Sequence, residues 1–190
     1  MDLFKSRNFK QDPKLDSNIA LSSKDYKDAY QFCNYDRGHI APLATFSKSD
    51  RFFVVNYLSN ITPQNSSLNR TSWKYLEEKE RELVNNNKYN KLYILAGTYN
   101  ITNQEICQLP NSNKNSKVPH GFFKIIAAFS HKEGNIALAS FIFKNQKPKD
   151  NNFCNNITTI DNIETLTNID IMPASSNLQN NIALLEDLGC

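Results

Sequence analysis

The sequence lacks a long apolar run, and none of its segments approaches the ~20 consecutive apolar residues that a membrane-spanning helix needs. We therefore expect no membrane partner. The first residues, MDLFKSRNFKQD, also lack an apolar stretch of the signal-peptide type. Either the protein stays in the compartment where it is made, or a leader is removed before this numbering begins.

A large excess of positive charge is also missing, because 22 basic and 19 acidic residues leave a net charge of only +3. A nucleic-acid enzyme needs its positive charge placed along one groove, and a total cannot reveal placement. The hydrophobic share of 39% is that of an ordinary soluble globular protein. No internal repeat or long linker divides the 190 residues, so we expect a single domain over residues 1–190.

The four cysteines form no close C-x-x-C pair of the kind found in zinc sites. Cys33, Cys107, Cys154 and Cys190 could all be reduced thiols. Alternatively, Cys190 at the end of the chain could be bonded to Cys154, which would stabilise the fold by ~3 kcal/mol or more. Such a bond would imply an oxidising compartment. The spacing alone favours neither alternative.

Local patterns predict a strand–strand–helix unit at about residues 36–85, after a polar, loop-rich segment. Its elements are a turn feeding a strand at 36–46 (DRGHIAPLATF), a β-branched and aromatic strand at 53–62 (FVVNYLSNIT), and a helix at about 68–85. Pro63 should end the second strand, and Ser66-Ser67 should cap the helix.

Beyond residue 85 the patterns predict more antiparallel strands. The expected strands are 92–97, 121–130 and 135–144, the last two forming a hairpin around HKEGN, with a polar loop at 104–118 and a short helix near 161–167. Antiparallel strands accompanied by a few helices indicate the α+β class.

The tetrapeptide Asp36-Arg37-Gly38-His39 is the first candidate for chemistry. A lone histidine is more often structural than catalytic, but these neighbours favour a catalytic role. Arg37 brings a fixed positive charge, Gly38 removes bulk so that a large ligand can approach, and Asp36 could orient the loop or the arginine. A neutral imidazole is suited to taking a proton from water near neutral pH.

A second polar cluster lies on the predicted helix. Asn69 falls in its first turn, and Glu77 and Arg81 follow at a spacing of four residues, which brings their side chains together. Asn69 is two turns from Glu77 and about 80° away around the helix, so both can face one metal site. Without further context, Asn69 would be a cap and the Glu77–Arg81 pair a surface ion pair. Glu80 falls near the apolar stripe, and the sequence offers no reason for it.

Both clusters belong to a longer pattern that resembles the DNA/RNA non-specific endonucleases of the ββα-metal superfamily. DRGHIAPLATF followed by YLSNITPQNSSLNRTSWKYLEEKEREL carries most of the similarity, which is too long to arise by chance. Weaker matches extend it over nearly the whole chain: RNFKQDP at 7–13, VPHGFFKII at 118–126, FC at 153–154 and LGC at 188–190.

The resemblance implies a Mg²⁺-dependent endonuclease that hydrolyses DNA and RNA with little regard for sequence and leaves 5′ phosphates. His39 would be the general base, Asn69 the sole direct protein ligand of Mg²⁺ (with Mn²⁺ as a substitute), and Glu77 the carboxylate that orders the water of the metal. The other implied site residues contact phosphates (Arg37, Arg81 and Arg7) or support the site (Asp36, Asn60 and Gln64). Contacts confined to phosphate and sugar carry no base information.

The same resemblance implies a central antiparallel sheet flanked by helices, a ββα-metal unit, and a Cys154–Cys190 disulfide in a secreted or periplasmic protein. The pairing of Cys33 and Cys107 stays open, as do a homodimer and an inhibitor or immunity-type protein partner. Many family members have Gln where this chain has Arg70, which could add a phosphate contact or point to solvent; of the two we favour solvent. The alternatives to an active nuclease are a nucleic-acid-binding module without catalysis and a phosphodiesterase of small nucleotides.

Overall fold

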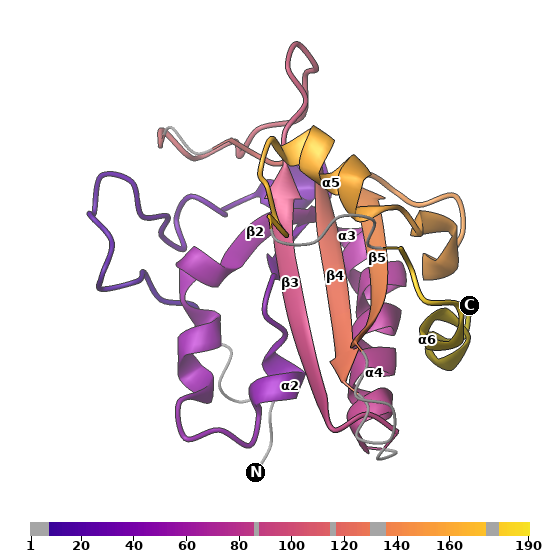
Figure 1. Cartoon of the computed structure of the whole chain (residues 1–190). Helices are drawn as coiled ribbons and strands as arrows, with labels where there is room; N and C mark the ends of the chain where they lie inside the picture. The colour runs from indigo at the N-terminus through magenta and orange to yellow at the C-terminus, as the bar shows by residue number, and fades with distance from the viewer. Residues whose placement is uncertain (1–7, 86–87, 115–116, 130–135, 174–178) are drawn as a thin grey trace.

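The computed structural model describes residues 8–85, 88–114, 117–129, 136–173 and 179–190 (Figure 1). The strands are β1 (Tyr35–His39), β2 (Ile61–Asn65), β3 (Lys91–Tyr99), β4 (Gly121–Phe129) and β5 (Ile136–Lys144). The helices are α1 (Ala29–Cys33), α2 (Leu43–Phe46), α3 (Ser66–Arg70), α4 (Ser72–Asn85), α5 (Ile160–Thr167) and α6 (Ile182–Leu188), with 3-10 turns η2 (Phe52–Asn56), η3 (Leu58–Asn60) and η4 (Phe153–Asn156). None of the helices in these ranges is long and apolar enough to cross a membrane.

The larger sheet is antiparallel, in the order β3-β4-β5, and helices pack on both of its faces (Figure 1). Side chains alternate along β4, so Phe122 and Ile126 pack in one core with α4 and α6, while Phe123 and Ile125 pack in another with α5. The α+β class and the strands expected after residue 85 are therefore confirmed. The predicted hairpin turn lies outside the described residues.

Helix α4 is the element that joins this core to the polar cluster. Trp73, Leu76 and Leu83 form its buried stripe against the sheet, at most 4% exposed. The predicted helix is divided at Thr71 into α3 and α4. Its cap is Asn65, whose side chain accepts the backbone N–H of Ser67 at 3.1 Å, so the expected Ser66-Ser67 cap is wrong by one residue.

Strands β1 and β2 form a separate two-stranded ladder, and the DRGH segment lies in β1 itself rather than in a turn before a strand. Pro63 does not end the ladder but lies within β2, opposite Arg37. Proline is tolerated there because β2 has a ladder partner on one side only. On the other side the buried Asn145 donates to the Pro63 carbonyl at 3.0 Å and accepts the N–H of Asn65 at 2.7 Å, which ties β2 to the end of β5.

The predicted strand at 53–62 is wrong, because most of this segment forms the turns η2 and η3. Two asparagine side chains explain the difference. Asn60 bonds both backbone groups of Ala41, with both distances 2.9 Å, and Asn56 is buried against His39. Side-chain bonds of this kind stabilise turns at the expense of a ladder.

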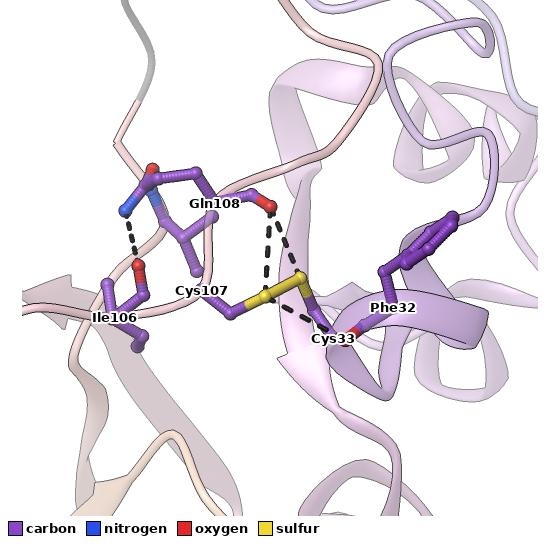
Figure 2. The surroundings of a disulfide bond; sticks show 6 residues. Phe32, Cys33, Ile106, Cys107 and Gln108 are labelled. Atoms are coloured by element: carbon purple, nitrogen blue, oxygen red, sulfur yellow. Dashed lines mark hydrogen bonds between the residues drawn. A yellow bond between two sulfur atoms is a disulfide. The ribbon is translucent and has the colours of Figure 1, made fainter.

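Two disulfides tie loops to this framework. The predicted Cys154–Cys190 bond is present, and the open question about the other two cysteines is answered by a Cys33–Cys107 bond. Figure 2 shows the Cys33–Cys107 bond, which joins the end of α1 to the loop at Ile106–Gln108. Because Cys33 lies two residues before the start of β1, this bond holds the loop against the ladder that carries the DRGH residues.

Candidate active site

A cleft of about 660 Å³ opens between β1, α2 and the paired helices α3 and α4. It brings together the predicted site residues that are far apart in the sequence: Asp36, Arg37, His39, Asn69, Glu77 and Arg81. Strand β1 supplies the first three, α3 supplies the asparagine, and successive turns of α4 supply the last two. Phe9 and Arg70 also line the cleft, and neither was a predicted site residue.

The imidazole of His39 is held by two neighbours. Its Nε2 lies 3.0 Å from Oδ1 of Asn56, a side chain only 1% exposed. An amide oxygen can only accept, so this contact assigns the proton to Nε2 and the basic lone pair to Nδ1 in the neutral ring. The Phe9 ring packs beside the imidazole with 5.7 Å between ring centroids. The histidine therefore has a defined orientation on the cleft wall.

Asp36 holds the amide of Asn69. Its Oδ2 accepts from Asn69 Nδ2 at 3.0 Å, which turns the other amide atom, Oδ1, away from the carboxylate. Arg70 binds the same carboxylate through two hydrogen bonds of 2.8 and 2.7 Å and lies over the Tyr30 ring. The expectation that Arg70 points to solvent is therefore wrong in part: its side chain is 58% exposed, but its guanidinium is anchored.

Glu77 and Arg81 carry polar atoms that the described part of the protein leaves unsatisfied. Glu77 Oε1 and Arg81 Nη1 are buried and have no hydrogen-bond partner there. The pKa of Glu77 is raised to about 7, mainly by burial and also by the nearby charge of Glu80, against the opposing effect of the cations Lys124 and Arg81. A buried carboxylate oxygen without a partner is expected where a cation or a cation-bound water completes the site.

The donor set fits one hard cation that keeps most of its water. Across the described residues no group of three or more His, Cys, Asp or Glu side chains could hold a metal ion. The amide oxygen of Asn69 and the carboxylate of Glu77 both line the cleft. The other two carboxylates of the cleft, those of Asp36 and Glu78, already pair with Arg70 and Lys74. Mg²⁺ takes oxygen ligands and commonly binds through one or two protein groups while retaining several waters.

Arg37 lies on the same face of β1 as His39, because alternate residues of a strand share a face. Its guanidinium carbon is 5.3 Å from the Phe9 ring centroid and 5.6 Å from that of Tyr26, and one of its nitrogens donates to the Ser23 carbonyl at 3.3 Å. These contacts keep a permanently charged group at the cleft wall.

The sequence matches the DNA/RNA non-specific endonuclease family over residues 2–178. The chain belongs to this family. A nuclease of Serratia marcescens is 35% identical over 165 residues, which cover 87% of this chain and 61% of the relative. Nuclease EXOG, mitochondrial, of Mus musculus is 30% identical over 148 residues, covering 73% and 38%. The chain thus spans about three fifths or less of the length of these relatives.

The fold of this endonuclease-family chain also matches a solved structure. A chain in the crystal structure of the EndoG/EndoGI complex superposes with a TM-score of 0.74 at 24% identity, over 87% of this chain and 68% of that chain. At this identity the match shows the fold alone, and that fold is the ββα-metal type implied by the sequence.

The remaining predicted residues of this family member lie behind the cleft or outside the described part. Asn60 fixes Ala41, just after His39. Gln64 is fully buried, and a Cβ at position 38 would collide with its side chain, so Gly38 makes room for Gln64 rather than for a ligand. Arg7 lies outside the described residues. The sequence did not predict a role for Asn56, because nothing in its position within the predicted strand indicated contact with His39.

Proposed function

We propose that this protein is an endonuclease that hydrolyses phosphodiester bonds of DNA and RNA without base selection and leaves 5′ phosphates. The observation that carries the proposal is the shared cleft of His39 and Asn69, which come from different elements of the fold and face one space. The family membership supports the same reaction.

In the proposed reaction, His39 Nδ1 takes a proton from water as the water oxygen bonds to phosphorus. The bond from phosphorus to the 3′ oxygen breaks and the departing oxygen takes a proton from a second water molecule, so one product carries a 5′ phosphate and the other a 3′ hydroxyl. Arg37 and Arg81 hold the charged phosphate oxygens, for which a guanidinium fork is a good geometric match. The Asn56 contact keeps the imidazole in the tautomer that this step requires.

Mg²⁺ is the cofactor we propose for Asn69, with Glu77 accepting hydrogen bonds from the bound water. When bound, the ion would supply charge neutralisation for the phosphate undergoing cleavage. Asp36 positions the Asn69 amide for this role through the bond to its Nδ2. A neutral amide leaves most of the charge of the ion available to the substrate.

The two disulfides support an oxidising compartment, so we propose that the protein works outside the cytosol. A homodimer and an inhibitor partner stay predictions. The matched crystal structure is that of an EndoG/EndoGI complex and concerns inhibition of EndoG, which supports a search for an inhibitor of this chain.

The direct test incubates supercoiled plasmid and RNA with the protein in Mg²⁺ or in EDTA. We expect both substrates to be degraded only with the metal. His39→Ala should lower the rate about 10²–10⁴-fold, the usual contribution of a general base. His120→Ala, at a histidine outside the cleft, is the control and should cut like the wild type. Wild-type rates for His39→Ala would exclude the histidine base, and no cleavage by the wild type would exclude the nuclease function.

A further inference from the structure

A second hollow, of about 320 Å³, adjoins the cleft between α2, the C-terminal half of α4 and strand β3. Ala44 and Arg81 line both spaces, so the hollow continues the cleft along α4. The axial rise of a helix is about 1.5 Å per residue, so Asn85 at the far end of the hollow is about 12 Å along α4 from Glu77. The proposed reaction uses nothing beyond Arg81.

The walls of this hollow combine one cation with an apolar floor. Lys48 follows α2 on its rim, is exposed, and takes part in none of the ion pairs among the described residues. Val84 and Ile94 are 44% and 40% exposed on the floor, and Leu92 lies beside them. Glu80 also reaches the hollow, but its carboxylate lies 2.9 Å from the ammonium of Lys124, which offsets its charge.

This combination fits a nucleotide better than a purely apolar ligand. A nucleotide offers a phosphate for the lysine and a flat base for the aliphatic floor. The apolar side chains carry no hydrogen-bonding groups with which to read a base, so they would hold any of the bases. The volume is at the lower end of the ~300–1,000 Å³ range of ligand pockets, which suits one nucleotide.

We infer that the hollow of Lys48, Val84 and Ile94 is a subsite for a nucleotide that flanks the cleaved bond, with Lys48 binding its phosphate. This inference rests on the proposed function. At 3.4 Å per stacked nucleotide, and more for an extended strand, the 12 Å along α4 places this nucleotide about two to four positions from the cleaved bond. The subsite explains why an edge strand of the sheet leaves apolar side chains exposed beside the cleft.

Binding of single-stranded oligonucleotides to His39→Ala, with Mg²⁺ present, tests the phosphate contact. Adding Lys48→Ala should weaken binding about 3–10-fold and lower the slope of log K against log salt by about 0.7, the value for one phosphate of a single strand. Lys149→Ala is the matched control, because Lys149 lines a hollow that shares no residue with the cleft. Its slope should equal that of the parent.

The base contact is tested with fully abasic strands, which avoid any question of register. The parent should prefer normal strands, and Ile94→Thr should reduce that preference by about threefold or more without changing the salt slope. If Lys48→Ala had the same affinity and the same salt slope as Lys149→Ala, the proposed subsite would be wrong. If Ile94→Thr instead dissociates a dimer, measured by light scattering, the hollow is an interface between two copies and the inference is wrong.

These outcomes are separate from the fate of the proposed function. If the wild type fails to degrade plasmid and RNA, the nuclease proposal fails first. If it degrades both, while the Lys48 and Ile94 variants bind like their control, the subsite alone is wrong.

Discussion

The charged side chains on the two sides of α4 differ in whether they are paired within the protein. On the side that faces the sheet, Glu80 and Lys124 are 3% and 0% exposed and form an ion pair of 2.9 Å, with the ammonium 4.2 Å from the centroid of the Trp73 ring. On the side that faces the cleft, Glu77 and Arg81 have buried polar atoms without a hydrogen-bond partner in the described part of the chain. On the sheet side the two opposite charges pair with each other, although neither Glu80 oxygen nor Lys124 Nζ makes a hydrogen bond of regular geometry. On the cleft side Glu77 Oε1 and Arg81 Nη1 are left for a ligand.

This difference shows which residues of α4 stabilise the fold and which serve the site. An unsatisfied buried polar group costs about 1–3 kcal/mol, so the cleft side lowers stability. A buried ion pair is close to neutral compared with apolar residues of the same shape. The Glu80–Lys124 pair nevertheless binds α4 to β4, and thereby sets which residues of the helix face the cleft.

The largest expected effect on the sheet side comes from removing one partner of the buried pair. Lys124→Met leaves the Glu80 carboxylate uncompensated in the core and should lower the free energy of unfolding by about 3–5 kcal/mol. The double variant Lys124→Met/Glu80→Leu should recover most of that loss. Urea unfolding measures both. Equal stability of the single variant and the wild type would show that the pair is not buried as described.

A smaller effect of opposite sign is expected on the cleft side, in the metal-free protein. The folded pKa of Glu77, about 7, lies above its ordinary value of 4.5, so the folded state holds this proton more tightly. The stability from that proton is complete below the unfolded pKa and is lost as the pH rises through about 7. Glu77→Gln cannot ionise, and at pH 8 in EDTA we expect it to be about 1–3 kcal/mol more stable than the wild type.

Thermal unfolding of Glu77→Gln at pH 5 and pH 8 checks this sign, with Glu78→Gln, at a side chain 41% exposed, as the control. If the unfolding temperature changed equally between pH 5 and pH 8 in the wild type and in both variants, the predicted sign would be contradicted. The stabilised Glu77→Gln protein should also be impaired as a nuclease, because the proposed metal site loses its carboxylate.

The smallest effect is expected at the rim of the cleft on α4. Lys74 and Glu78 form an ion pair of 3.5 Å there, with side chains 56% and 41% exposed. Lys74→Ala should change the free energy of unfolding by no more than about 0.5 kcal/mol. A loss above 2 kcal/mol in urea unfolding would mean that this pair contributes to stability as a buried pair does, despite its exposure to solvent.

Local patterns were sufficient for the parts of the protein in which neighbours in sequence are neighbours in space. The hairpin strands follow from the glycine-containing turn signal between them, and α4 follows from its helical apolar stripe. The DRGH and Asn69 segments indicated the site through a long family resemblance. Glu80 had no explanation from sequence, because its partner Lys124 is 44 residues away on the opposite element. The helical spacing showed the position of Glu80 in the apolar stripe, but it could not show the cation that pairs with its carboxylate.

The errors share a related cause. The segment FVVNYLSN has strong strand propensity, but the contacts of Asn56 and Asn60 with distant groups favour turns. Pro63 remains in a strand because Asn145, from the far end of β5, covers its free side. Tertiary contacts of this kind override local propensity and leave no periodic signal.

The most direct test of the central claim, that His39 and an Asn69-bound Mg²⁺ act on one phosphate, is a Mg²⁺ titration of the cleavage rate. Residual activity of His39→Ala should reach half its maximum at the wild-type Mg²⁺ concentration, because this variant loses the base and keeps the ligand. Asn69→Ala should need about 10–100-fold more Mg²⁺, the usual cost of disturbing a metal site. An unchanged titration for Asn69→Ala would contradict the account.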